Sequence, residues 1–280
     1  MHCLSLKMVC ETKIVADDHK SIPGTKNESV ITSSLMWPPL SSHPSDMEDS
    51  MRSDKVYIRE FHPYDQDAAQ RIFYEGLKER IPNTAFRGLK QQPKALILYV
   101  VLTLMCFVIT KSLLLSCCVP IILMGLRYYF SRKVILGYLE HVLHTDMSDI
   151  EQYYMKPAGS CFWVAVLNGK VVGIVAAKGN EEENNVELCR MSVDSSYRGK
   201  GIAKALGHKV MEFAILNSYS SIVLGTTAVK MAAHKLYESL GFAHMGVIEN
   251  YSLPAMDNTI LERMFFQLRY HRYSLQLHEE

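Results

Sequence analysis

The segment 186–206, VELCRMSVDSSYRGKGIAKAL, limits the possible folds more than any other part of the chain. Its first half is a largely apolar run of strand-forming residues that ends at Asp194, which predicts a β-strand. Its second half has apolar residues at helical spacing from Gly201 onward, which predicts a helix. Glycines and basic residues lie between the two halves, in YRGKG at positions 197–201. A strand that leads through such a loop into a helix N-terminus is typical of an anion site, because backbone N–H groups point at the ligand.

The phosphate-binding patterns GxGxxG and GxxxxGK[ST] do not fit this loop, whereas [Q/R]-x-x-G-x-[G/A] does, through Arg198, Gly201 and Ala203. On this pattern the chain resembles the GCN5-related N-acetyltransferase superfamily, in which the loop holds the pyrophosphate of acetyl-CoA. Two further stretches support the resemblance. HKLYESLGF at 234–242 is similar to the superfamily's LYxxxGF helix end, and the Asn-Gly dipeptide within 163–175 is a strong hairpin signal between apolar runs. The alternative is an ordinary strand–loop–helix with a solvated basic turn.

The remaining periodic segments occur in the order that this superfamily fold requires. Before the central segment we expect a strand at 56–61, a helix that ends at Pro82, and a loop at 83–88. After it we expect a strand at 221–227, a helix at 228–240, and strands near 244–251 and 264–270. The implied fold class is α/β (α+β), a central mixed and mostly antiparallel sheet flanked by helices, with an insert after the first helix.

That insert is residues 95–126, which are apolar except for a few positions such as Lys111 and Pro120. A single membrane span needs ~20 residues. Basic residues flank the segment on both sides, and such residues mark the cytoplasmic side of a membrane. A membrane-embedded hairpin with Lys111 near its tip satisfies both flanks, whereas one straight span does not. Arg127 and Arg132 are then expected to contact lipid headgroups, and the alternative is a helical hairpin buried in a soluble protein.

These patterns divide the chain into four parts. Residues 1–53 lack a sustained apolar period and carry Ser, Pro and Asp clusters, which predicts a disordered tail. Residues 54–94 hold the first strand and helix, 95–126 the membrane hairpin, and 127–280 the main part of the acetyltransferase domain. The formal net charge of +1 excludes a strong field for nucleic acid. Seven scattered cysteines indicate a reducing compartment and no disulfide framework, and no metal-binding spacing occurs.

The insert and the motif RYYFSRKV at 127–134 resemble the camello-like, membrane-bound branch of the superfamily. Over residues 56–280 the chain is similar to the aspartate-acetylating members of that branch. The resemblance implies direct acetyl transfer from acetyl-CoA to the amino group of L-aspartate in a ternary complex. It also implies a membrane of the endoplasmic reticulum, with the catalytic domain facing the cytosol, and a mitochondrial membrane as the alternative. A cysteine S-conjugate or a protein lysine stays open as acceptor, as does a noncatalytic membrane scaffold.

The resemblance also assigns residues to the cofactor. The backbone of the strand at Met191 and Val193 is expected to pair with the pantetheine arm of acetyl-CoA. The loop and first helical turn are expected to hold the pyrophosphate through backbone amides and basic side chains. These loop residues are Arg198, Gly199, Lys200, Gly201, Ile202 and Ala203.

Catalytic and acceptor-binding residues are assigned with alternatives. Tyr237, by its position in LYxxxGF, is expected to protonate the CoA thiolate, and Glu187 is the candidate base; Glu79 and Asp146 are other candidates. Arg190 and Arg87 are expected to bind the carboxylates of the acceptor, since arginine binds carboxylates in a bidentate manner. Each of these residues also has an ordinary structural interpretation, as a packing tyrosine or a solvated surface charge. The superfamily often has Asn seven residues before the Tyr, where this chain has Lys230.

Overall fold

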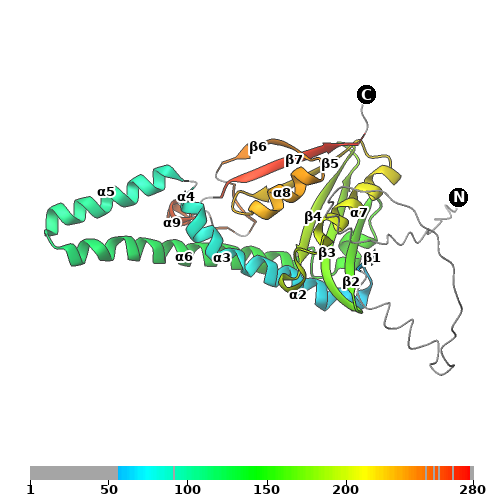
Figure 1. Cartoon of the computed structure of the whole chain (residues 1–280), viewed down its shortest axis with the longest axis horizontal. Coiled ribbons are helices and arrows are strands. Elements are labelled where there is room, and N and C mark those ends of the chain that lie inside the picture. The colour runs from blue at the N-terminus through cyan, green and yellow to red at the C-terminus, as the bar shows by residue number, and fades with distance from the viewer. Residues whose placement is uncertain are drawn as a thin grey trace, which may run out of the picture.

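The computed structural model describes residues 56–277 other than 91, 250, 255, 258 and 267, so the predicted tail at 1–53 lies outside the described residues. Its centre is one seven-stranded sheet with the order β1-β2-β3-β4-β5-β7-β6 (Figure 1). Only β4 and β5 pair in parallel; the other neighbours are antiparallel. The predicted fold class is confirmed. The strands are β1 (Tyr57–Glu60), β2 (Ser160–Leu167), β3 (Lys170–Asn180), β4 (Asn185–Val193), β5 (Ser221–Thr227), β6 (Ala243–Ile248) and β7 (Tyr270–Gln276).

Helices cover both faces of this sheet and extend beyond it (Figure 1). The longer ones are α2 (Gln66–Lys78), α5 (Pro93–Thr110), α6 (Leu113–His144), α7 (Ile202–Leu216) and α8 (Met231–Ser239). Shorter helical pieces are η1 (Pro63–Asp65), α3 (Arg80–Pro82), η2 (Asn83–Arg87), α4 (Gly88–Lys90), η3 (Glu151–Met155), η4 (Ser195–Tyr197) and α9 (Ile260–Phe265). The order of strands and long helices matches the expected order, including the insert after the first helix.

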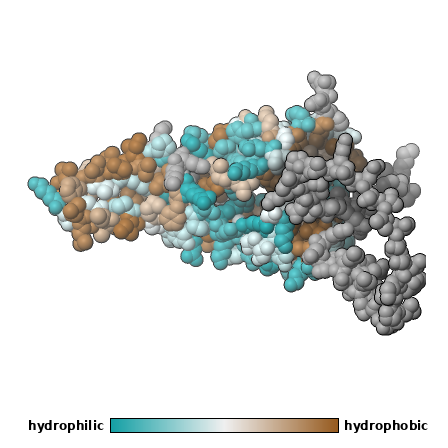
Figure 2. All heavy atoms as spheres, in the orientation of Figure 1, coloured by the Kyte–Doolittle hydropathy of each residue, from teal (hydrophilic) through white to brown (hydrophobic). Residues whose placement is uncertain are grey.

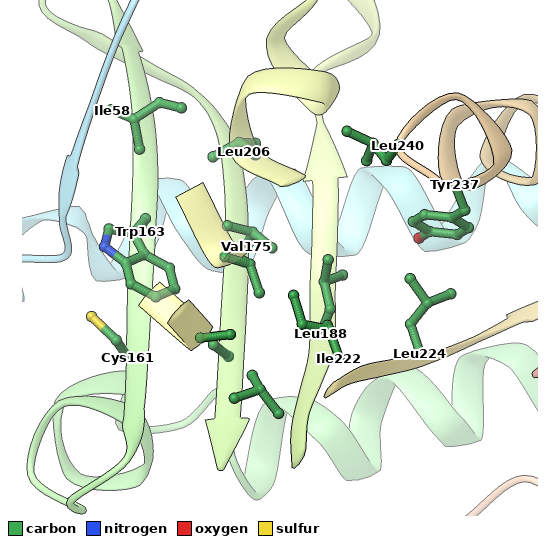
Figure 3. Packing of buried hydrophobic residues seen from close by; sticks show 14 of the residues in the cluster. Ile58, Cys161, Trp163, Val175, Leu188, Leu206, Ile222, Leu224, Tyr237 and Leu240 are labelled. Atoms are coloured by element: carbon green, nitrogen blue, oxygen red, sulfur yellow. The ribbon is translucent and has the colours of Figure 1, made fainter. Parts of the chain in front are cut away.

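Two hydrophobic cores lie on opposite faces of the sheet because side chains alternate along each strand. On β2, Trp163 and Ala165 point into a core with α7, whereas Phe162 and Val164 point into a core with α2 and α6. In the first core, Leu206 of α7 and Leu240 at the end of α8 pack beside the sheet (Figure 3). Asn168 and Gly169 connect β2 to β3 with φ values of 51° and 71°, which a two-residue hairpin turn requires.

A β-bulge interrupts β4 at Arg190. The pairing with β3 runs from Cys189 opposite Ala176 to Ser192 opposite Ile174, so β4 has one extra residue there. Arg190 has a φ of 54°, in the left-handed region that non-glycine residues seldom adopt. The bulge shifts the alternation of side chains. Met191 and Val193 therefore pack toward the core with α7, and Ser192 points to α2.

The insert is a helical hairpin that projects from the sheet (Figure 1). Helices α5 and α6 pack against each other, and Lys111, with a φ of 50°, lies in the turn between them. Their side chains are largely apolar and exposed, as shown by Ile109 at 75% and Leu114 at 78% (Figure 2). Helix α6 is long and apolar enough to cross a membrane, and α5 includes a shorter apolar helix at Ala95–Thr110. Helix α6 continues without a break past residue 126 into the catalytic part.

Three expectations about local structure are wrong. Residues 83–88 are helical rather than a loop, because Pro82 keeps a helical φ of −64° and therefore does not end the helical run. The predicted strand at 264–270 begins only at Tyr270, since the Thr259 side chain caps α9 and Phe265 stacks on Phe130 of α6. Arg127 is 1% exposed and therefore contacts no headgroup; it donates hydrogen bonds to Ala85 O and Gln92 Oε1.

Candidate active site

A cavity of about 530 Å³ opens where β4 and β5 diverge. The two strands pair over residues 185–187 and 221–223, and the C-terminal half of β4 then leaves β5. Met191, Ser192 and Val193 line the cavity from β4, and α8 lines it from the other side. Because the edge of β4 turns away from β5 here, its backbone groups can pair with a bound molecule in extended form.

The loop after β4 forms one end of the cavity. Gly199 and Gly201 have φ values of 79° and 78°, and a Cβ on either would meet no heavy atom within 4 Å. These glycines are therefore required by the backbone conformation and not by crowding within the chain. Helix α7 begins directly after Gly201, and Ile202, Ala203 and Gly201 all line the cavity. The free N–H groups of this helix start and its positive dipole end suit a phosphate.

The two basic side chains of the loop do not both point into the cavity. Arg198 lines it, but its guanidinium donates to both carboxylate oxygens of Glu79, at 3.0 and 2.7 Å, and to Val193 O. This hydrogen-bonded pair lowers the pKa of the Glu79 carboxyl. Lys200 is not among the lining residues, and its ammonium lies over the ring of Tyr197. The side chain of Arg198 thus joins the end of α2 to the loop across the cavity.

Tyr237 lies in the wall that α8 contributes (Figure 3). It is 7% exposed, and its ring packs edge-on against Phe242. Burial raises the pKa of its hydroxyl to about 12, despite the nearby charge of Arg80. Tyr237 therefore keeps its proton at neutral pH and can act as a hydrogen-bond donor or as an acid toward a strong base.

Three cationic side chains besides Arg198 and Lys204 line the cavity: Arg80, Arg87 and Lys230. Arg87 is exposed, and its place at the acceptor end stays a prediction. Burial lowers the pKa of Arg80 to about 10 and that of Lys230 well below its ordinary value. Sequence reasoning missed Arg80 as a site residue and noted Lys230 only as a departure from Asn. The available signal was the cluster of charges at 78–80, shortly before Pro82.

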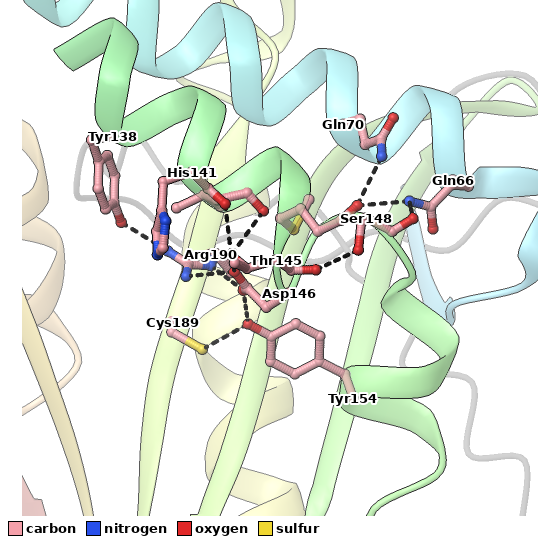
Figure 4. A network of polar contacts seen from close by, with 12 residues as sticks. Gln66, Gln70, Tyr138, His141, Thr145, Asp146, Ser148, Tyr154, Cys189 and Arg190 are labelled. Atoms are coloured by element: carbon pink, nitrogen blue, oxygen red, sulfur yellow. Dashed lines mark hydrogen bonds and ion pairs between the residues drawn. The ribbon is translucent and has the colours of Figure 1, made fainter. Parts of the chain in front are cut away.

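Arg190 does not lie among the residues that line the cavity, in contrast to its expected role. The bulge turns its side chain to the face of α6, where Nε and Nη2 donate to Asp146 at 2.6 and 3.0 Å (Figure 4). Its Nη1 donates to the hydroxyl of Tyr138 at 2.9 Å. Tyr154 also donates to Asp146, so this carboxylate is the centre of a network behind β4. The Arg190–Asp146 pair therefore connects β4 to the end of α6, on the face of the sheet that packs against α6.

Glu187 is also outside the cavity lining. It is exposed on β4, at the position where the strand pairs with both Lys178 of β3 and Val223 of β5. It precedes the divergence of β4 from β5, whereas Met191 and Val193 follow it. Of the candidate catalytic residues, the structure places Tyr237 and Glu79 in the cavity lining, and Glu187 and Asp146 outside it.

The comparison with known proteins agrees with this geometry. The sequence pattern of the Acetyltransferase (GNAT) family matches residues 129–242, which include the bulged strand, the glycine loop and α8. Over the full length of both chains, the protein is 64% identical to N-acetylaspartate synthetase of Danio rerio and 59% identical to that of Homo sapiens. The chain belongs to the GNAT family of acetyltransferases. This acetyltransferase is also 38% identical to N-acetyltransferase 8 of Mus musculus, over 68% of this chain and 85% of that relative, which supports the predicted camello-like branch.

Acetyl-CoA is the acetyl donor of the GNAT family, and the cavity of this acetyltransferase fits it. The open space beside Gly199 and Gly201 leaves room for a phosphate group at the start of α7. The free edge of β4 is next to this loop, as the amides of a pantetheine arm require. Tyr237 is among the residues that line the same cavity.

Proposed function

We propose that this acetyltransferase transfers the acetyl group of acetyl-CoA to the amino group of L-aspartate, giving N-acetyl-L-aspartate and CoA. The observation that carries the proposal is the pair of cations Arg80 and Arg87, together with the titratable Lys230, in the cavity that also contains the glycine loop. Aspartate brings two carboxylates next to its amine, and such a ligand needs cations on more than one side. The names of the relatives that are 59–64% identical over their full lengths support the same acceptor.

In this proposal, backbone groups of Met191 and Val193 pair with the pantetheine arm. Backbone N–H groups from Gly199 to Ala203 bind the pyrophosphate, with the dipole of α7 adding favourable charge. The Arg198 side chain, which bonds to Glu79, closes the loop against α2. Lys200 then contributes charge at the outer side of the loop.

The chemical step is direct transfer in a ternary complex. The amine nitrogen of aspartate, once deprotonated, forms a bond to the acetyl carbon, and the bond from that carbon to sulfur breaks. The departing thiolate of CoA takes the proton of the Tyr237 hydroxyl, which its raised pKa keeps in place until then. Backbone N–H groups at the edge of β4 stabilise the oxyanion. Glu187 stays a prediction as the base, and from outside the cavity lining it would act through water.

We further propose that the α5–α6 hairpin anchors the protein in a membrane of the endoplasmic reticulum, with the catalytic domain in the cytosol. A mitochondrial membrane is the alternative. The exposed apolar side chains of α5 and α6 support contact of residues 95–126 with lipid (Figure 2). Basic residues on both sides of the hairpin support a cytosolic position for both of its ends.

The test is release of CoA by the detergent-purified full chain with acetyl-CoA and a panel of acceptors. The panel contains L-aspartate, other free amino acids, a cysteine S-conjugate and a lysine peptide. Aspartate-selective release, with N-acetylaspartate identified as product, supports the proposal. Faster release with the conjugate or the peptide would show that this compound, and not aspartate, is the acceptor. No release with any acceptor would favour a noncatalytic scaffold. Reactions without protein are the control for nonenzymatic release.

A further inference from the structure

The Arg80 side chain is a half-buried cation that lines the cavity and has no hydrogen-bond partner in the described part of the chain. Its Nε is buried and makes no hydrogen bond, and none of the described carboxylates accepts a hydrogen bond or ion pair from it. The neighbouring carboxylate is that of Glu79, but Arg198 occupies both of its oxygens. A guanidinium that is partly withdrawn from water without a counter-charge is costly, and its burial is compensated when an anionic ligand binds beside it.

The surroundings of Arg80 indicate which anion it receives. Two anionic groups enter this cavity, the phosphates of acetyl-CoA and the carboxylates of the acceptor. Arg80 and Tyr237 line the same cavity, and the groups that act electrostatically on the guanidinium are the hydroxyls of Tyr138 and Tyr237 and the Arg198–Glu79 pair. Tyr237 is the residue proposed to face the CoA sulfur, and Tyr138 bonds to Arg190, directly before the strand edge proposed to hold the pantetheine. Arg80 therefore lies at the thioester end, where the acceptor amine must also lie.

We propose that Arg80 binds one of the two carboxylates of the acceptor and so makes the cavity selective for a dicarboxylic amino acid. This proposal rests on the proposed acetyl transfer to aspartate. The exposed Arg87, at the rim of the same cavity, is then available for the other carboxylate. The Arg80 guanidinium stays charged at pH 7, because its pKa of about 10 is lowered but still well above neutral.

The test compares the full chain in detergent with its Arg80→Ala and Arg80→Lys variants. Acceptors are L-aspartate, L-asparagine, which lacks the side-chain carboxylate, and the α-amide of aspartate, which lacks the other. Arg80→Ala is expected to lower kcat/KM for aspartate roughly ten- to a hundredfold, as for a lost charged hydrogen bond. The preference of the wild type for aspartate over one of the two amides should disappear in the variant. That amide identifies the carboxylate that Arg80 binds.

Three controls keep the outcome decisive. The acetyl-CoA dissociation constant should not change, which shows that the variant is folded and that Arg80 does not serve the phosphates. Arg80→Lys should recover part of the aspartate preference, since it retains the charge but not the bidentate geometry. Lys78→Ala removes an exposed positive charge two residues away, outside the cavity, and should leave both substrates unaffected.

An unchanged aspartate preference in Arg80→Ala, or a loss mainly of acetyl-CoA affinity, would overturn the proposal. These failures differ from failure of the proposed function. If the wild type does not acetylate aspartate, the function is wrong whatever Arg80 does. If the wild type does so and Arg80→Ala retains its selectivity, only the role of Arg80 is wrong.

Discussion

The carboxylate of Asp146, just beyond the end of α6, accepts two hydrogen bonds from the guanidinium of Arg190 at the bulge of β4. The pair therefore connects the helix that emerges from the apolar hairpin to the strand edge that lines the catalytic cavity. Both side chains are about one-fifth exposed, at 20% and 18%. At this exposure the ion pair is partly desolvated.

Removal of either partner of this pair should destabilise the protein. Removing one partner of a buried ion pair lowers the free energy of unfolding by ~3–5 kcal/mol. Because this pair is partly exposed, we expect a loss at the lower end of that range, about 3 kcal/mol. Thermal and denaturant unfolding of the detergent-purified Arg190→Ala, Asp146→Ala and double variants measure the effect. The double variant should lose less than the sum of the two single losses, because both remove one interaction. Strictly additive losses would show that the two side chains act independently.

Substitution of Gly201 should abolish acetyl-CoA binding. A glutamate there is strained at a φ of 78° and places a negative charge where the pyrophosphate is proposed to bind. The matched control is Gly169→Glu, since Gly169 has a φ of 71° and equally open surroundings but lies in the β2–β3 turn. Acetyl-CoA titration should show a loss of more than about tenfold for Gly201→Glu and little change for the control. Unchanged acetyl-CoA affinity in Gly201→Glu would show that the loop does not bind the cofactor. Both variants should stay in the membrane fraction.

Tyr237→Phe should lower kcat by ~10²-fold or more and leave the acetyl-CoA dissociation constant unchanged, as expected for loss of a general acid. Because burial raises the pKa of Tyr237 to about 12, its hydroxyl should not cause a loss of wild-type activity below about pH 10. A pH profile of kcat tests this. The exposed Tyr74→Phe on α2 is the control. If Tyr237→Phe retains the full kcat, Tyr237 is a packing residue and not the general acid.

Acetyl-CoA binding should be accompanied by proton uptake at Lys230. Burial, with the charges of Arg80 and Arg198, lowers the Lys230 pKa, and Glu79 opposes this. A bound anion raises that pKa again, so protons are taken up on binding. The affinity should then fall as pH rises through the interval between the two pKa values. Calorimetry in buffers of different ionisation enthalpy measures the uptake. Lys230→Met should abolish it and the exposed Lys235→Met should retain it; uptake that persists in Lys230→Met would assign the proton to another group.

Both ends of the chain should lie on the cytosolic side of the membrane. Helix α5 has 18 residues and is therefore about 27 Å long, close to the ~30 Å of a bilayer core, and α6 returns beside it. Glycosylation acceptor sites added at Ser41 and after Glu280 should stay unmodified in cells, while the same tag on a lumenal reporter is modified. The natural sites at Asn27 and Asn250 lie outside the described residues. Glycosidase-sensitive mass at either end would contradict the hairpin and require a single span.

Local chemistry made part of this structure predictable. The Asn168–Gly169 turn, the glycine loop and the LYxxxGF helix each depend on a few adjacent residues, and all three are where the sequence indicates. The bulge at Arg190 was not predictable, because the pattern of β4 does not show which residue is extra. Arg190 was therefore expected in the cavity although it faces α6. Arg80 was missed for a related reason, since its position depends on a three-residue helix that only the packed fold defines.

The burial of Arg127 also required the structure. In the sequence it directly follows an apolar segment and has the appearance of a headgroup ligand. In the fold, η2 and the start of α5 close over it, and Ala85 O and Gln92 accept its hydrogen bonds. Sequence spacing cannot distinguish an arginine at a membrane surface from one under a helix.

Because α6 is continuous, the α5–α6 hairpin and the catalytic core share one helix. The same helix starts at Leu113 in the hairpin, buries Arg127 beneath η2, and supplies Val134 and Leu139 to the core behind the sheet. Removal of residues 95–126 would cut this helix and take away nearly all of α5, close to the segment that carries Arg87. The hairpin is thus not a detachable tether, and a water-soluble form of the enzyme would need replacement of the exposed apolar side chains of α5 and α6 rather than deletion of residues 95–126.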